Sequence, residues 1–99
     1  MAQTPEAKVK AAVRKILAEF GVYYFSPPAN GYGKAGVPDI IVCVNGYFLA
    51  IECKANGNKP TELQKREISL IQKAGGFAIV VDENNIDDVR STLSTMLTP

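Results

Sequence analysis

The chain of 99 residues contains no histidine and only two cysteines. The missing histidine excludes nuclease mechanisms that depend on a histidine, zinc sites with histidine ligands and a Ser-His-Asp triad. Two cysteines without histidine also argue against a structural zinc site, which takes about four ligands. Any metal chemistry in this chain must therefore use oxygen ligands.

Long apolar runs are absent as well. No run approaches the roughly 20 residues of a membrane-spanning helix, and the start lacks the apolar segment of a signal peptide. Ninety-nine residues fit one domain, 1–99, with no room for a second catalytic module, and 46% apolar residues is an ordinary globular composition. We expect a soluble cytoplasmic domain, of a bacterium or a phage-infected host cell, that has no membrane partner.

The chain also has almost no net charge, at +1, but its charges are unevenly spread. Residues 1–73 hold ten Lys and Arg against six Asp and Glu, whereas residues 74–99 hold one against four. The basic part is suited to a phosphate backbone. An ordinary solvated surface of mixed charge remains the alternative.

Two apolar runs are joined by Asn45-Gly46, the strongest local signal for a β-hairpin, because both central residues of a type I′ turn need a positive φ. A two-residue turn pairs Val44 with Tyr47. Counting back along both strands then places Asp39 opposite Glu52. The sequence therefore predicts two carboxylates face to face on one side of the sheet.

Like charges at directly opposed positions destabilise a sheet, so folding alone does not account for this pair. A hard divalent cation, Mg²⁺ or Mn²⁺, removes the repulsion. Lys54 shares the face of Glu52, because residues i and i+2 of a strand point the same way. Alternatively, Asp39 starts a strand at a turn, and Glu52 pairs with Lys54 or protects a sheet edge.

The same register places Cys43 and Cys53 on opposite faces of the hairpin. We therefore expect no disulfide between them and interpret both as reduced core residues.

The other elements follow from caps and periodicity. Thr4-Pro5 is a helix start and Gly21 an end, Thr61 and Gln64 form a capping-box pattern, and Gly75-Gly76 stops the helix that follows it. The predicted order is αβββαβα: a helix over 5–20, a strand over 22–25, a loop over 26–36, the hairpin, a helix from 61 to about 74, a strand over 77–81 and a last helix marked by Ile86, Val89, Leu93 and Met96. The two strands around the second helix are expected to run parallel.

The motifs Gly36-Val37-Pro38-Asp39 and Glu52-Cys53-Lys54 resemble those of the PD-(D/E)xK nuclease superfamily. With Glu6 before them and Gln64 after them, the order is similar to that of its VRR-NUC branch, over nearly the whole chain. The resemblance implies an α/β restriction-endonuclease-like fold, with a mixed central sheet flanked by helices. It also implies a metal-dependent DNA endonuclease, and stand-alone members act as homodimers on four-way Holliday junctions.

In this interpretation Asp39 and Glu52 bind the metal and Lys54 assists the nucleophile or the charged transition state. The resemblance implies that the Cys53 carbonyl is a third ligand, that Glu6 supports the metal or a water, and that Gln64 lies beside the catalytic lysine. Glu6 is equally explained by the helix dipole, and Gln64 by the capping box.

Candidate DNA contacts lie in the loop 26–36 and around the start of the second helix. A glycine-rich loop permits close approach to phosphate, a tyrosine can stack on an unpaired base and basic side chains contact the backbone. The candidates are Asn30, Tyr32, Lys34, Lys59, Lys65 and Arg66.

We therefore expect a metal-dependent, structure-selective endonuclease that acts on branched DNA as a homodimer, with no nucleotide cofactor. A phage origin would suit so compact a nuclease. Three alternatives remain open: a non-catalytic DNA-binding module with a nuclease fold, a restriction-type enzyme that reads sequence, and an α/β domain whose acids merely pair with neighbouring basic residues.

Overall fold

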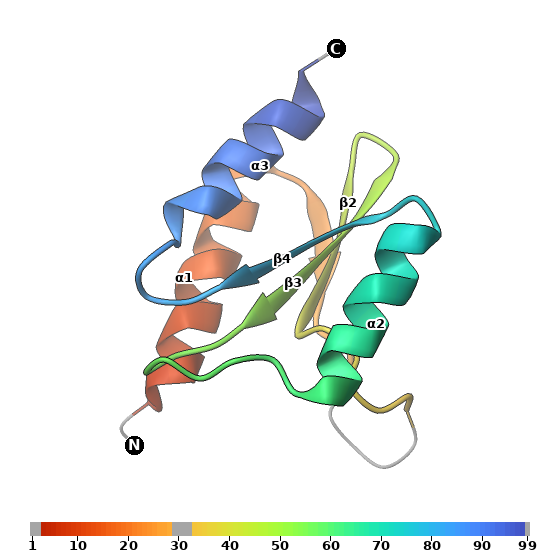
Figure 1. Cartoon of the computed structure of the whole chain (residues 1–99). Coiled ribbons are helices and arrows are strands. Elements are labelled where there is room, and N and C mark those ends of the chain that lie inside the picture. The colour runs from red at the N-terminus through yellow and green to blue at the C-terminus, as the bar shows by residue number, and fades with distance from the viewer. Residues whose placement is uncertain (1–2, 29–32, 99) are drawn as a thin grey trace.

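The computed structural model describes residues 3–28 and 33–98 as a sheet with helices packed on it (Figure 1). The elements are α1 (Pro5–Phe20), β1 (Tyr23–Phe25), β2 (Ile40–Val44), β3 (Tyr47–Cys53), α2 (Glu62–Lys73), β4 (Phe77–Val81) and α3 (Asp87–Leu97). This is the predicted order αβββαβα, and the α/β fold class is confirmed.

Side-chain caps account for the starts of the first two helices. The Thr4 hydroxyl accepts a hydrogen bond from the Ala7 amide at 3.1 Å, and Pro5 opens α1. In α2, Thr61 and Gln64 form the predicted capping box through reciprocal side-chain to backbone bonds of 3.2 and 2.9 Å.

The hairpin has the predicted register. Asn45 and Gly46 have φ of 53° and 83°, as a type I′ turn requires, and the β2 to β3 ladder pairs Val44 with Tyr47. The last ladder pair is Ile40 with Ile51. Asp39 lies one residue before it and Glu52 one residue after it, so the ladder leads directly to their opposition.

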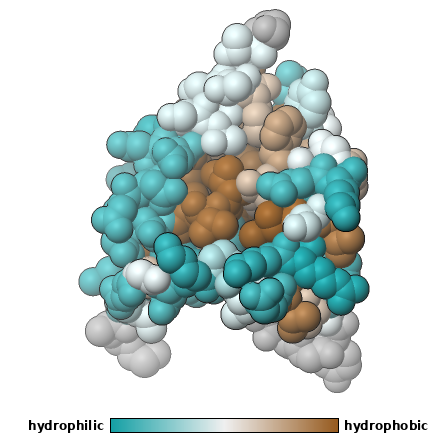
Figure 2. Space-filling view, viewed as in Figure 1, coloured by the Kyte–Doolittle hydropathy of each residue, from teal (hydrophilic) through white to brown (hydrophobic). Residues whose placement is uncertain are grey.

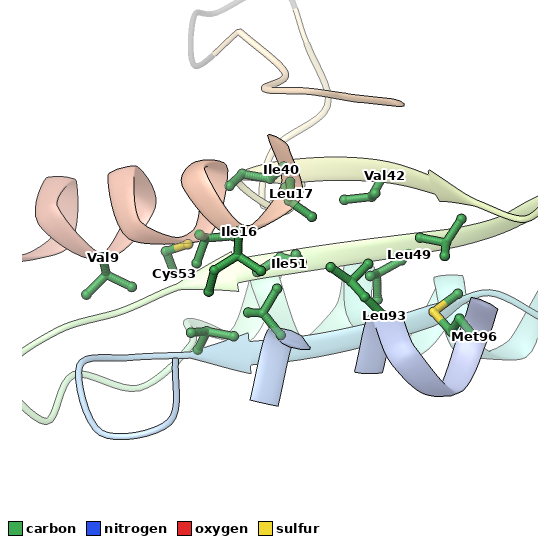
Figure 3. Packing of buried hydrophobic residues seen from close by; sticks show 14 of the residues in the cluster. Val9, Ile16, Leu17, Ile40, Val42, Leu49, Ile51, Cys53, Leu93 and Met96 are labelled. Carbon is green, nitrogen blue, oxygen red and sulfur yellow. The ribbon is translucent and has the colours of Figure 1, made fainter. Parts of the chain in front are cut away.

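The strands lie in the order β1-β2-β3-β4, antiparallel except for the parallel pair of β3 and β4. Helices α1 and α3 cover one face of this mixed sheet, and α2 lies on the other (Figure 1). The core fills the space under α1 and α3, where Leu17, Ile51 and Leu93 are fully buried (Figure 3).

The face occupied by α2 is covered less completely. Figure 2 shows apolar residues at the surface in the middle of the view, over β4 and the middle of α2, with hydrophilic residues on both sides. β4 forms one edge of the sheet, and its Val80, which pairs with Glu52, is exposed on this face. Phe77 is also exposed but lies on the opposite face, beside α3. Within residues 3–28 and 33–98, no helix is long and apolar enough to cross a membrane.

Two sequence-based interpretations are wrong. β3 lies between β2 and β4, so Glu52 cannot be a charge that protects a sheet edge. Cys43 is an exposed free thiol and not a core residue, because its face of the hairpin has no helix over it at that point, whereas Cys53 is buried in the core as expected.

Candidate active site

Asp39 and Glu52 form the centre of the candidate site, at the end of the β2 to β3 ladder. The Asp39 Oδ2 atom accepts a hydrogen bond from the Cys53 amide at 2.8 Å, which anchors the carboxylate across the strands. Glu52 is only 2% exposed, and its Oε1 atom is buried without a hydrogen-bond partner among the described residues. A buried, unpartnered carboxylate oxygen in an internal strand is costly and calls for a cation.

The charge of Asp39 acts on the pKa of Glu52. Burial, followed by the charge of Asp39, raises the pKa of Glu52 to about 7, although attraction to Lys54 opposes this shift. A proton or a divalent cation relieves the same repulsion. Burial also raises the pKa of the Cys53 thiol to about 12. The Cys53 side chain lies in the hydrophobic core, on the opposite face of β3 from Glu52.

Lys54 lies beside Glu52 as its place on the strand predicted. Its Nζ atom is 3.4 Å from Glu52 Oε2, and its side chain is only 12% exposed. The Lys54 amide donates to the Val81 carbonyl at 2.9 Å, which fixes the backbone of this residue to β4. The ammonium group thus pairs with one oxygen of Glu52, while Oε1 stays buried and without a hydrogen-bond partner among the described residues.

Lys10 is a site residue that the sequence analysis missed. Its Nζ atom lies 3.3 Å from Asp39 Oδ1 and 3.7 Å from Glu6 Oε2. Burial lowers the pKa of Lys10, but attraction to Asp39, helped by Glu6, makes the net shift of this pKa upward. Its spacing of four residues from Glu6 gives a local signal for that pair only, because the contact with Asp39 depends on how α1 packs against the hairpin.

The Gly36-Val37-Pro38-Asp39 segment brings Asp39 into place. Gly36 has φ of 79°, and a Cβ atom on it would meet the backbone carbonyl of Leu63 at 2.7 Å. Only glycine allows the chain to pass the start of α2 this closely. Pro38, two residues on, is buried.

The residues present fit a divalent cation, because two opposed carboxylates meet at a buried oxygen that lacks a partner. Glu6 is less closely engaged, since its side chain is 40% exposed and reaches the acid pair through Lys10. Among the described residues, no three His, Cys, Asp or Glu side chains converge as a metal-binding group. Two carboxylates are the nucleus of the candidate metal site.

Gln64 lies in α2 and is engaged in the cap. Its Oε1 atom accepts from the Thr61 amide, the role that the capping-box alternative gave it. This contact uses the carbonyl oxygen and leaves the Gln64 amide nitrogen to other partners.

Some of the candidate DNA contacts form ion pairs within the protein, and others are exposed. Lys34 pairs with the buried Glu67 at 3.2 Å, and Lys65 pairs with Glu62 at 3.3 Å. Lys59 and Arg66 are exposed near the start of α2. The two remaining candidates, Asn30 and Tyr32, lie outside the described residues.

Comparison with known proteins identifies the family of this fold and site. The profile of the family described as "Archaeal holliday junction resolvase (hjc)" matches residues 7–81, three quarters of the chain, from α1 to the end of β4. The chain belongs to this family. It is thus a VRR-NUC nuclease-fold domain, an endonuclease whose substrate class is DNA.

Individual relatives agree with the family. "Putative nuclease p44" of Acyrthosiphon pisum secondary endosymbiont phage 1 is 40% identical over 86 residues, which cover 85% of each protein. The solved structure of a "VRR_NUC domain protein" has a TM-score of 0.75 at 25% identity and covers 96% of this chain and 92% of its own. A second solved structure, titled "VRR_NUC domain", has a TM-score of 0.73 at 21% identity and covers 90% of this chain and 97% of its own.

Proposed function

We propose that this nuclease hydrolyses phosphodiester bonds of branched DNA, four-way junctions in particular, with Mg²⁺ or Mn²⁺ held by Asp39 and Glu52. The observation that carries the proposal is the buried Glu52 Oε1 atom, which has no hydrogen-bond partner among the described residues and belongs to a carboxyl group whose pKa is raised by burial and by the charge of Asp39. The Cys53 carbonyl is the third protein ligand in this proposal. Glu6 supports the site through Lys10.

The bound ion would supply Lewis-acid chemistry, polarising a phosphoryl oxygen and lowering the pKa of a bound water. Lys54 donates hydrogen bonds toward the attacking water or the phosphate oxygens, because its ammonium group is fixed beside Glu52. The Cys53 amide and Lys10 orient the Asp39 carboxylate. The Gln64 amide nitrogen, on the helix that follows, contacts the phosphate or the water held by Lys54.

The small size of the domain favours branched DNA as the substrate, and the symmetry of a four-way junction favours a homodimer. A domain of 99 residues has little surface with which to read a base sequence, so shape is the simpler basis for recognition. A two-fold dimer would place two sites on the symmetrical strands of a junction. Lys59, Lys65 and Arg66 near the start of α2, with Asn30, Tyr32 and Lys34 in the loop before β2, are the proposed DNA contacts.

A cleavage assay tests the proposal. The purified protein is incubated with labelled four-way junction, flap, single-stranded and linear duplex DNA, in Mg²⁺, Mn²⁺ or EDTA. We expect metal-dependent cleavage with preference for the junction, lost at least 100-fold in Glu52→Gln and Lys54→Met. Asp87→Asn, which changes an exposed acid in α3, is the matched control and retains activity.

Each alternative predicts a different result. Binding without cleavage in either metal would identify a non-catalytic module. Cleavage of linear duplex at fixed sequences would identify a restriction-type enzyme. Equal rates on linear and junction DNA would contradict junction selectivity and leave the metal site intact.

A further inference from the structure

Lys10 differs from most lysines of the chain in its burial. Every lysine lies in the described residues, and only Lys10 and Lys54 are not exposed. Both contact the acid pair, since Lys54 Nζ lies 3.4 Å from Glu52 Oε2 and Lys10 Nζ lies 3.3 Å from Asp39 Oδ1. A lysine on a solvated helix face keeps its ammonium group in water. The two partly buried ammonium groups therefore belong to the candidate site, one beside each acid.

A pair on the surface of α1 does not account for the position of Lys10. Glu6 lies one turn earlier, and its Oε2 atom is 3.7 Å from Lys10 Nζ, a pair that can form on any exposed helix. The distance to Asp39 is shorter, although Asp39 belongs to the segment that enters β2. Lys10 Nζ therefore bridges two carboxylates from separate segments of the chain.

Two carboxylates that meet at one cation are also what a second metal ion would use. Divalent ions of this class are bound by carboxylate oxygens, and two-ion nucleases place them about 3.5–4 Å apart. In the proposed function Asp39 and Glu52 hold an ion. A second ion that shares Asp39 needs a further carboxylate, and Glu6 is the acid next to it. The ammonium group of Lys10 occupies that position.

The carboxylate oxygens of the acid pair leave one position for an added cation. Asp39 Oδ1 faces Lys10, and Oδ2 accepts a hydrogen bond from the Cys53 amide at 2.8 Å. Glu52 Oε2 faces Lys54. The buried Glu52 Oε1 atom has no hydrogen-bond partner among the described residues. One such oxygen fits one ion.

The charges of the site favour the same number. When ionised, Glu6, Asp39 and Glu52 carry three negative charges. Lys10 and Lys54 carry two positive charges, which leaves a net charge of −1. One divalent ion changes this to +1, which suits an anionic phosphodiester. A second ion would raise it to +3 and would lie against the ammonium group of Lys10, where like charges repel strongly.

We infer that the Lys10 ammonium group takes the place of a second metal ion, so that the site holds one divalent cation per chain, and that Glu6 holds this ammonium group at Asp39. An ammonium group has three N–H donors, so Lys10 can serve both carboxylates and keep one donor for a phosphate oxygen. This inference rests on the metal site of the proposed function and specifies how many ions that site binds.

A Mn²⁺ titration of the DNA-free protein, in which EPR measures free and bound ion, tests the inference. We expect one bound Mn²⁺ per chain in the parent protein. Lys10→Ala removes the ammonium group and leaves room for an ion, so this variant should bind one ion more. Two Mn²⁺ ions about 3.5–4 Å apart are magnetically coupled, which should broaden the spectrum of this variant. Affinity for the first ion should rise about tenfold, because a nearby positive charge is lost.

Glu6→Gln/Lys10→Ala tests the part played by Glu6. This double variant lacks the carboxylate that would complete the second position, so it should bind one uncoupled ion. Lys8→Ala is the matched control, because Lys8 is an exposed lysine of the same helix and its loss changes the charge equally. It should bind one ion with unchanged affinity.

The variants are chosen to remain folded. Alanine is the strongest helix former, and Lys10 lies in the interior of α1. Should Lys10→Ala fail to fold, Lys10→Gln carries the same expectation, because its amide is uncharged and its oxygen can itself bind Mn²⁺. The parent protein is decisive in one direction without any variant, since two coupled ions in it would exclude the role given to Lys10.

The outcomes separate this inference from the proposed function. Two coupled ions in the parent protein, no added ion in either folded Lys10 variant, or two ions in the double variant would overturn the inference. A parent protein that binds two coupled ions and cleaves junctions keeps the proposed function and excludes only the role of Lys10. One ion in the parent protein and a coupled pair in Lys10→Ala, without cleavage of any DNA, would support the inference and contradict the proposed catalysis.

Discussion

At the scale of single residues, the site is a small set of charges whose balance depends on a cation. Asp39 and Glu52 repel one another, while Lys10 lies on the Asp39 side and Lys54 on the Glu52 side. The Glu52 Oε1 atom stays without a partner among the described residues. Without a metal ion, a proton on the acid pair is therefore the remaining way to relieve the repulsion.

Glu52 should make the metal-free protein less stable as the pH rises. Its folded pKa of about 7 lies above its ordinary value of 4.5, so the folded state binds the extra proton between these values. The favourable contribution is complete below pH 4.5 and is lost as the pH rises to 7 and beyond. In EDTA, urea unfolding at pH 5 and pH 8 should show this loss in the parent protein and not in Glu52→Gln, and parallel profiles would contradict it.

Lys10→Met should show whether the Lys10 ammonium group and a metal ion compete for the Asp39 carboxylate. Without Lys10 the acid pair is less compensated, and the free energy of unfolding in EDTA should fall by about 1 kcal/mol or less, as for other partly exposed ion pairs. Mg²⁺ should then raise the melting temperature more in the variant, because Lys10 no longer competes at Asp39 Oδ1. A smaller Mg²⁺ effect than in the parent protein would show that Lys10 does not compete with the ion.

At the scale of elements, close contacts between segments position these charges. The strand entry at Gly36 passes the start of α2, and the α2 cap involves Gln64, which is also a candidate for catalysis. Structural and catalytic roles therefore overlap at this helix start, and variants must be chosen to separate them.

Gly36→Ala should displace Asp39. Gly36 and Gly57 both have a positive φ, 79° and 75°. A Cβ atom added at Gly36 would clash with the Leu63 backbone, whereas one added at Gly57 would point into open space. Gly57→Ala should cost about 1–2 kcal/mol from backbone strain. Gly36→Ala should cost a further 1–3 kcal/mol or so from overpacking and should also lower cleavage. Equal losses in urea unfolding would mean that the loop moves aside at little cost.

Gln64→Glu tests the two roles of Gln64, because glutamate also serves as the third residue of a capping box. Thr61→Ala, in contrast, removes the cap acceptor and should cost about 1 kcal/mol of stability. If Gln64 acts in catalysis, Gln64→Glu should be as stable as the parent protein and cleave at least tenfold more slowly. Unchanged cleavage would restrict Gln64 to the cap.

At the scale of the whole molecule, a net charge of +1 conceals a basic excess in residues 1–73. Specific phosphate contacts, more than total charge, should therefore control DNA affinity. Lys59, before α2, and Lys73, in its last turn, are exposed lysines near opposite ends of the same helix.

Lys59→Glu should weaken junction binding in Ca²⁺ and reduce the dependence of log K on log salt by about one unit, because one phosphate contact is lost. Lys73→Glu carries the same charge change, and its effect should be much smaller. Titrations at 50 to 200 mM salt measure both slopes. Similar effects of the two variants would show that general charge, not the α2 start, governs binding.

The sequence by itself determined the local features. The Asn45-Gly46 turn specified the register, because a two-residue loop leaves one way to pair the strands, and this register alone opposes Asp39 to Glu52. The element order and the α2 capping box were also predicted, because they depend on caps, turns and periodicity within a few residues of one another.

Only the tertiary structure decided which residues complete this arrangement. Lys10 reaches Asp39, Leu63 requires glycine at position 36, Glu52 lies in an internal strand, and Cys43 is exposed. Each depends on the packing of segments far apart in the chain, for which local pattern carries no signal. Local chemistry thus fixed the acid pair, whereas packing fixed its burial and its counter-charges.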